Sequence, residues 1–396
     1  MQAATRPVWA EIDIDTLIHN IGEVRRATEP SAEIMTVVKA NAYGHGAVQC
    51  SRIFLENGAK SLAVAALTEA VELRGSGVEA PILVLGYTPV EHFGETLKWG
   101  VTPTIYTVEG ARALADVAES AGKIANTHIK VDTGLGRIGF LPSDESLKAI
   151  EEISQYPSID IEGIFTHFAV ADAEDKEYTR GQFESFLGFT ERLDARGISP
   201  PMRHVSNSAA IIDLPEYSLD AVRPGCMLYG LYPSDEVDTG RVDLRPSMTL
   251  RTRLSNLKVV PPGTGISYGL THTTSAESFI GSLPVGYADG YSRALSNRAK
   301  VLVRGKRASV VGRVCMDQCM IDLTGVNEAE IGDKVVLFGG RVEGAPTAED
   351  VAGWMGSITD EVVSTISRRV PRVYFEGGEV VEVVDYVRDG AENSQS

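Results

Sequence analysis

The chain has 396 residues, which is long for one ordinary domain and suits two. Apolar residues make up 43% and charged residues 23%, a composition typical of globular proteins that bury a large core. The formal net charge of −17 argues against nucleic acid or an anionic membrane as a partner, because both require a basic surface. We see no secretory signal or transmembrane segment, and we expect the four cysteines to be reduced thiols. We therefore predict a cytoplasmic protein.

The first 230 residues repeat one pattern, in which a short apolar segment is followed by a turn and a helix-like stretch. Strands are predicted at residues 34–38, 62–65, 82–85, 102–105, 127–131, 161–166, 202–205 and 221–223. Helices are predicted at residues 48–57, 67–74, 108–120 and 176–195. Eight strand–helix units in this length favour a closed (β/α)₈ barrel. An open doubly wound sheet is the alternative, because local patterns do not reveal closure.

The pattern changes near Pro233, where a polar stretch at residues 234–246 is typical of a linker. Strands are then predicted at residues 250–260, 278–284, 300–303, 308–314, 319–323 and 334–338, with one helix at 347–355. We predict a barrel domain over residues 1–240, a β-rich domain over 241–390 and a disordered tail over 391–396.

Charged and imidazole side chains follow several of the predicted barrel strands. They are Lys39, Asp132, Arg137, His167, His204 and Arg223. The carboxyl ends of barrel strands carry the active site in enzymes of this fold. One such histidine or arginine is usually structural, but a group of them at one rim favours a functional site.

Lys39 is the sharpest candidate, because it follows the apolar run Ile-Met-Thr-Val-Val. A lysine whose pKa is lowered by burial is a Schiff-base nucleophile. The glycines at positions 44 and 46 would let a ligand approach the backbone closely. Ser208 and the Gly225–Cys226 backbone suit a phosphate. These features fit pyridoxal 5'-phosphate (PLP), and they fit equally well a sugar-phosphate aldolase-type barrel without a cofactor.

The segment VVKANAYGHG at residues 37–46 resembles the PLP-lysine signature of alanine racemases. Seven further segments extend this resemblance in order: VDTGLGRIG (131–139), GIFTHF (163–168), SNSA (206–209), VRPG (222–225), ISYG (266–269), GYADG (286–290) and GRVCMDQ (312–318). The resemblance covers residues 9–372 and favours the PLP interpretation over the aldolase one.

The resemblance implies a (β/α)₈ barrel followed by a β-rich domain, in a head-to-tail homodimer whose active sites are shared. It implies interconversion of L-alanine and D-alanine, which supplies D-alanine for peptidoglycan. Lys39 would carry PLP and act as the base on one face of the substrate. Tyr268 of the partner subunit would act on the other face. Two bases are needed because one face of the carbon loses a proton while the other gains one.

The resemblance also assigns the surrounding residues. Arg223 would contact the pyridine nitrogen of PLP and keep it unprotonated, which favours a racemase over a decarboxylase. His167 would contact both Tyr268 and Arg223. Arg137 would bind the PLP phenolic oxygen and the substrate carboxylate, the latter together with the Met316 backbone. The remaining cofactor residues would be Tyr43, Asn207, Ser208, Gly225 and Cys226, with Asp317, Tyr287 and Arg293 in supporting positions; no metal is expected.

Two positions remain open. Lys130 matches a lysine that is carbamylated in several family members, and an ion pair with a nearby carboxylate is the alternative. Asp360 stands where the family usually has a tyrosine that completes the phosphate site and the gate. A carboxylate there predicts weaker PLP retention or a roomier site, unless it turns to solvent.

Two other functions are consistent with the sequence. One is a racemase for serine or for a broader set of amino acids, since nothing in the sequence measures the volume of the site. The other is a non-catalytic PLP-binding barrel protein, but such proteins lack the β-rich domain.

Overall fold

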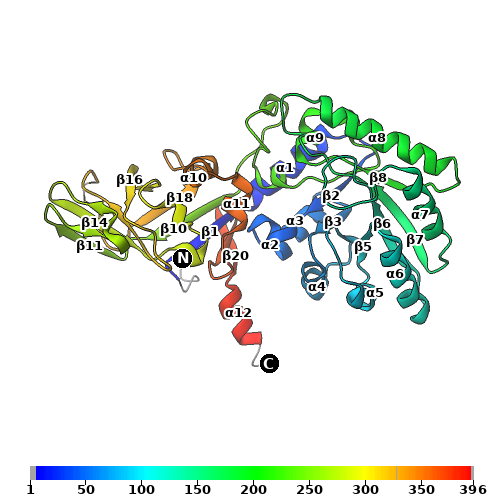
Figure 1. Cartoon of the computed structure of the whole chain (residues 1–396). Coiled ribbons are helices and arrows are strands. Elements are labelled where there is room, and N and C mark those ends of the chain that lie inside the picture. Colours follow the sequence, from blue (N-terminus) through cyan, green and yellow to red (C-terminus); the bar gives the residue numbers. More distant parts are fainter. Residues whose placement is uncertain (1–5, 327, 394–396) are drawn as a thin grey trace. The chain divides into compact units, whose positions relative to one another are not determined.

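The computed structural model describes residues 6–326 and 328–393, which form two compact units (Figure 1). The first, called the barrel unit here, comprises Ile18–Ala42 and Ala47–Leu244. The second, the sheet unit, comprises the described residues 6–17, 43–46, 245–326 and 328–393.

The barrel unit is built on eight parallel strands in the order β8-β7-β6-β5-β4-β3-β2-β9. Their bounds are β2 Glu33–Val37, β3 Ser61–Val64, β4 Ile82–Val84, β5 Thr102–Ile105, β6 Ala125–Lys130, β7 Ile159–Phe165, β8 Met202–His204 and β9 Ala221–Val222. Next to the two end strands, Asp220 N donates to Arg203 O at 3.1 Å and Arg223 N to Ser206 O at 2.9 Å. The sheet is thus a nearly closed barrel, which confirms the predicted (β/α)₈ fold.

Helices follow most of these strands because their sequences carry caps and one apolar face. Thr107 caps α6 by accepting from Gly110 N, and Ser143 caps α7 by accepting from Ser146 N. The helices of this unit are α1 Ile14–Ala27, α3 Ala47–Glu56, α4 Leu67–Gly75, α5 Phe93–Trp99, α6 Val108–Ser120, α7 Asp144–Ser154, α8 Glu177–Asp194 and α9 Ser208–Asp213. Helix α1 begins within the sheet unit.

The sheet unit contains a ten-stranded sheet in the order β11-β14-β17-β16-β15-β18-β10-β1-β19-β20. The strands are β1 Val8–Asp13, β10 Met248–Arg253, β11 Asn256–Val260, β14 Ser278–Leu283, β15 Lys300–Val303, β16 Lys306–Val311, β17 Cys319–Asp322, β18 Lys334–Gly339, β19 Arg372–Glu376 and β20 Glu379–Val384. A small hairpin of β12 Gly265–Ile266 and β13 His272–Thr273 and the helices α10 Ala348–Met355, α11 Thr359–Ser364 and α12 Tyr386–Asn393 complete its regular elements.

The two units and the predicted domains differ at their ends. Strand β1, within the predicted barrel domain 1–240, pairs with β10 and β19 of the sheet unit. Local sequence does not reveal such a pairing, because the partners lie more than 200 residues apart. Of the predicted tail 391–396, residues 391–393 end α12, and 394–396 lie outside the described residues.

The predicted strand 250–260 is two strands, because Leu254 and Ser255 donate their backbone N–H groups to Asp333 and Ser282 and leave the line of β10. None of the helices in the described part of the chain combines the length and apolar character that crossing a bilayer requires.

Candidate active site

Lys39 lies directly after β2, in a turn of unusual conformation. The side chain is half-buried. The four residues that follow it, 40–43, all have φ between 50 and 55°, so this short segment, called α2 (Lys39–Tyr43), winds with the left-handed sense. L-residues adopt this sense at a cost of about 1–2 kcal/mol each, so the surrounding structure must hold the turn in place.

Glu69 of α4 supplies part of that support. Its carboxylate accepts hydrogen bonds from Ala40 N at 2.6 Å and from Ala65 N at 2.8 Å. Asn41 also contributes, since its Oδ1 accepts from Ala47 N at 2.9 Å. The first residue after Lys39 is therefore tied to the end of the neighbouring strand β3.

Gly44 has a packing role, and the ligand contact expected from the sequence stays a prediction. Its φ is 80°, and an added Cβ would lie 2.1 Å from the carbonyl oxygen of Val363. Arg372 Nε donates to the Gly44 carbonyl at 2.9 Å, and the hydroxyl of Tyr374 donates to that of His45 at 2.8 Å. Side chains of the sheet unit thus hold the backbone of this segment, and Tyr43 at its start is buried.

The loop that carries Arg137 is organised by Asp132. The carboxylate of Asp132 accepts from the backbone N–H groups of residues 134–137, at 2.9 to 3.1 Å. Burial raises the pKa of this carboxyl. The backbone donors and nearby Lys130 together lower it by more, so the net shift of the pKa is downward. The Arg137 guanidinium is exposed and forms no hydrogen bond or ion pair within residues 6–326 and 328–393, so it is available to an anion.

Lys130 is 2% exposed at the end of β6, where its Nζ donates to Val131 O at 2.5 Å. Burial lowers the pKa of Lys130 to about 7; Asp132 opposes this shift, and Arg223 and Arg137 add to it. Lys130 makes no ion pair with a carboxylate in the described part of the chain. Its amine is therefore present to a large extent in the neutral, nucleophilic form at neutral pH.

Arg223 is buried after β9 and donates to groups from two other strand ends. One terminal nitrogen donates to His204 Nδ1 at 2.6 Å, and the other donates to Thr166 O at 2.8 Å. The second nitrogen also lies 3.3 Å from His167 Nδ1. Burial lowers the pKa of Arg223 to about 9, so the guanidinium stays charged at neutral pH. Burial, followed by Arg223, Arg137, Lys130 and Lys39, lowers the pKa of His167 well below its ordinary value.

The backbone after β8 and β9 meets at Ser208, which is 5% exposed. Its Oγ accepts from Gly225 N at 2.9 Å, and Asn207 caps the short helix α9 by accepting from Ala210 N. Cys226 follows in a buried turn. A Lys39 amine, the free Arg137 guanidinium and these hydroxyl and amide groups form a donor set that fits the aldehyde, phenolic and phosphate groups of PLP. The residues present therefore fit this cofactor.

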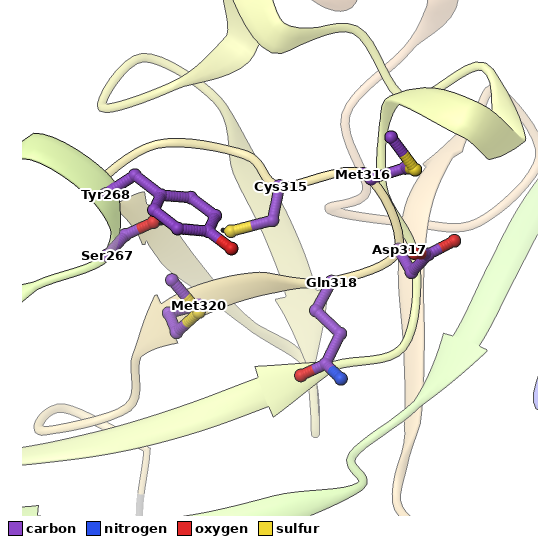
Figure 2. Close-up of a pocket in the computed structure, with 7 residues that line it drawn as sticks. All are labelled: Ser267, Tyr268, Cys315, Met316, Asp317, Gln318 and Met320. Carbon is purple, nitrogen blue, oxygen red and sulfur yellow. Dashed lines mark hydrogen bonds between the residues drawn. The ribbon is translucent and has the colours of Figure 1, made fainter.

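The sheet unit presents a second group of predicted residues around a pocket of about 440 Å³ (Figure 2). Tyr268 and Met316 line it and are 73% and 53% exposed. In Figure 2 the Tyr268 ring lies beside Cys315, while Met316 and Asp317 come from the loop before β17. The Ser267 hydroxyl donates to Arg313 O at 2.6 Å and so ties the backbone next to Tyr268 to this loop.

The loop that carries Met316 is held by the segment around Tyr287. Tyr287 N donates to Cys315 O at 3.1 Å, and Ala288 N donates to Met316 O at 3.0 Å. Arg369 links this loop to a buried carboxylate, because it contacts Asp317 at 2.6 Å and Asp289 at 3.1 Å. The position of the Met316 backbone thus depends on a network around Asp289.

Asp360 lies in the first turn of α11 and is half-buried. Tyr287 is 43% exposed, and Arg293 begins a separate 3₁₀ turn. The structure brings Lys39, Arg137, His167, Ser208 and Arg223 together at the carboxyl end of the barrel, and it groups Tyr268, Met316 and Asp317 in the sheet unit. The role of each residue stays a prediction.

Sequence reasoning missed two polar residues near this site. Glu69 lies within a helix, and His128 lies in mid-strand, where its imidazole contacts His204 at 2.9 Å. An acidic residue three positions into a predicted helix was the only available signal for Glu69. Nothing local distinguished His128 from an ordinary strand residue.

Comparison with known proteins matches both parts of the chain. The family model "Alanine racemase, N-terminal domain" matches residues 12–233, and "Alanine racemase, C-terminal domain" matches residues 247–374. An alanine racemase of Desulforamulus reducens is 52% identical over 93% of this chain and 99% of its own length. One of Clostridium tetani is 49% identical over 96% and 99%. The structure of alanine racemase from Clostridium difficile 630 has a TM-score of 0.94 and 45% identity, covering 97% of this chain and 99% of that one. The chain therefore belongs to the alanine racemase family, whose members depend on PLP.

Proposed function

We propose that this protein is a PLP-dependent alanine racemase that interconverts L-alanine and D-alanine and thereby supplies D-alanine for peptidoglycan. The observation that carries the proposal is the cluster of Lys39, Arg137, His167, Ser208 and Arg223 at the carboxyl end of a barrel with this family membership. PLP, when bound, withdraws electrons from the α-carbon of the amino acid and so makes its hydrogen acidic.

The residues of the barrel unit hold and orient the reactants. Lys39 would hold the cofactor through its amine, and that amine would hold the proton on one face of the α-carbon. Ser208 and the backbone at Gly225 and Cys226 would bind the phosphate of the cofactor, assisted by Tyr43 and Asn207. Arg137 binds the carboxylate of the substrate, for which a planar guanidinium is well suited.

Tyr268 holds the proton on the opposite face. A phenol has an ordinary pKa of about 10, so it needs a neighbouring donor to ionise readily near neutral pH. One terminal nitrogen of Arg223 donates to Thr166 O at 2.8 Å and Val205 O at 3.0 Å and lies 3.3 Å from His167 Nδ1. A guanidinium has donors only, so an unprotonated Nδ1 fits this contact, and the proton of the neutral imidazole is then on Nε2. That N–H stabilises the phenolate form of Tyr268.

We infer that two copies form a head-to-tail homodimer in which the sheet unit of each subunit completes the partner's site. Exposed Tyr268, Leu270 and Met316 support this inference, since a large apolar side chain gains by being covered. Met316 and Asp317 would then approach the substrate carboxylate of the partner subunit. A cytoplasmic location is part of the proposal, and it agrees with four cysteines that are all thiols and not disulfides.

A substrate panel tests the proposed function. The purified, PLP-loaded protein is incubated separately with L- and D-alanine, L- and D-serine and a larger amino acid, and the enantiomers are separated by chiral chromatography. Racemisation of alanine in both directions, faster than that of serine, supports the proposal. A preference for serine or a broad set would make it a different racemase. Racemisation of none of them, with PLP bound, would make it a non-catalytic PLP-binding protein.

A further inference from the structure

Three buried side chains of the barrel unit form a chain of contacts that reaches His167 through Arg223. His128, His204 and Arg223 are 5%, 0% and 3% exposed. His128 Nδ1 lies 2.9 Å from His204 Nε2, and Arg223 donates to His204 Nδ1 at 2.6 Å. The proposed reaction does not itself require His128, which lies in the middle of β6.

The chemistry of the three groups fixes where each proton is. A guanidinium has donors only, so Nδ1 of His204 must carry a lone pair. A neutral imidazole has one N–H, which in His204 is therefore on Nε2 and points at His128. His128 must accept this hydrogen bond at Nδ1, so its own proton is on Nε2. Burial and Arg223 lower the pKa of His128 to about 3, which agrees with a neutral ring.

The barrel is built so that these two imidazoles meet. Strand β7 lies between β6 and β8, and Gly163 of β7 is the residue opposite His128. A Cβ at Gly163 would lie 2.6 Å from ring atoms of His128, so only glycine leaves room for the imidazole. Phe165, also on β7, stacks on the His204 ring with centroids 4.7 Å apart and an angle of 7°. One glycine and one aromatic ring thus hold the pair in place.

We propose that His128 is a positioning residue for the racemase reaction, which acts by fixing the ring orientation and tautomer of His204 and through it the direction of the Arg223 guanidinium. The inference rests on the proposed function, because Arg223 matters there for the cofactor ring and for His167. Without an acceptor at position 128, the buried N–H of His204 has no partner. The ring then gains by turning, which withdraws the acceptor from Arg223.

Three variants and a control separate this role from simple packing. His128→Leu removes the acceptor, His128→Asn keeps an acceptor oxygen near the position of Nδ1, and Gly163→Ala displaces the ring without removing it. His92→Leu changes an exposed histidine on another surface. The PLP-loaded proteins are labelled with ¹⁵N-histidine, and imidazole signals are recorded by solid-state NMR without substrate. Alanine racemisation is measured separately.

The proposal predicts one His204 tautomer, protonated on Nε2, in the wild type and in His128→Asn. In His128→Leu and Gly163→Ala it predicts signals of both His204 tautomers. In the same two variants kcat/KM for alanine should fall about tenfold, because His204, which accepts from the charged Arg223, loses its other buried hydrogen bond. His128→Asn should recover most of this loss, and His92→Leu should match the wild type. Unchanged His204 signals in both His128→Leu and Gly163→Ala would overturn the proposal.

The NMR result does not depend on turnover. If the wild type racemises no amino acid, the proposed function fails, while the His204 signals still decide whether His128 fixes its tautomer. If His128→Leu does not fold, Gly163→Ala decides the question, with His128→Asn as its control, and unchanged His204 signals in Gly163→Ala would then overturn the proposal.

Discussion

Arg223 holds one terminal nitrogen 3.3 Å from Nδ1 of His167, so a permanent cation faces an imidazole at the end of the barrel. Burial and then this cation lower the pKa of His167, so the ring is neutral near pH 7. Arg223 bridges His167 and His204. The same contacts that orient His167 therefore also make it resist protonation, and this has a consequence for stability.

The barrel should lose stability as the pH falls below about 6.5, the ordinary pKa of histidine. His128, His167 and His204 all have lowered pKa values in the folded chain, that of His128 being about 3. Below pH 6.5 the unfolded chain binds protons that the folded chain does not, so each of the three removes up to about 1.4 kcal/mol per pH unit. Denaturation midpoints between pH 7 and pH 5.5 measure this slope.

Substitution at one of these histidines should reduce that slope. His128→Asn should remove about a third of it, because one of three titrating groups is lost. The exposed His92 provides the control, and His92→Asn should leave the slope unchanged. Equal slopes for the wild type and His128→Asn would contradict the buried-histidine explanation.

Lys39→Ala should abolish both covalent PLP binding and racemisation, because no other amine occupies this position after β2. The absorbance of the protein-bound cofactor and its reduction by borohydride measure attachment, and chiral chromatography measures activity. Lys60→Ala, at an exposed lysine before β3, is the matched control. If Lys39→Ala retains both properties, the assignment of the cofactor to Lys39 is wrong.

Lys130 should react reversibly with CO₂. A pKa near 7 leaves much of its amine neutral, and Nζ then bonds to the carbon of CO₂ while one proton leaves to solvent. Protein incubated with ¹³C-bicarbonate should show one carbamate signal that is absent from Lys130→Met. Lys176, which pairs with Asp213 at 2.5 Å, should remain unmodified. A spectrum without any carbamate signal would leave Lys130 as a plain amine bonded to Val131 O.

Asp360→Tyr should tighten PLP binding, because it removes a negative charge and adds the phenol that the family resemblance implies for the phosphate site. We expect about a tenfold lower Kd, the effect of one charge-assisted hydrogen bond. Asp360→Asn removes the charge without adding the phenol and should give an intermediate value. Spectroscopic titration of protein stripped of its cofactor measures the Kd. Equal affinities of the wild type and Asp360→Tyr for PLP would show that Asp360 does not weaken binding of the cofactor.

The sequence predicted the barrel and the residues at its strand ends because both have local signals. Lys39, His167 and Arg223 each follow a short apolar run, and the barrel topology brings the carboxyl ends of such runs together. The resemblance to one family supplied the roles that residue types alone left open between PLP and an aldolase-type site.

The contacts missed from the sequence are those that closure of the chain creates. His128 meets His204 only because β7 lies between their strands and has glycine at position 163. Asp289 reaches Arg369 across 80 positions of sequence, and β1 pairs with β10 across a greater separation. A local sequence pattern does not show which distant residue a side chain will contact, or at what distance in space.

The central claim is that Lys39 and Tyr268 act on opposite faces of the α-carbon, and hydrogen exchange in D₂O tests it most directly. The wild type should introduce deuterium at the α-carbon of both alanine enantiomers. Tyr268→Phe should keep its PLP and exchange the hydrogen of D-alanine through Lys39. Exchange of L-alanine and racemisation should fall by about 10²–10⁴-fold, the usual contribution of a general base. Tyr87→Phe, at a tyrosine 65% exposed in the barrel unit, should behave as wild type. Undiminished exchange of L-alanine by Tyr268→Phe would contradict the two-base account.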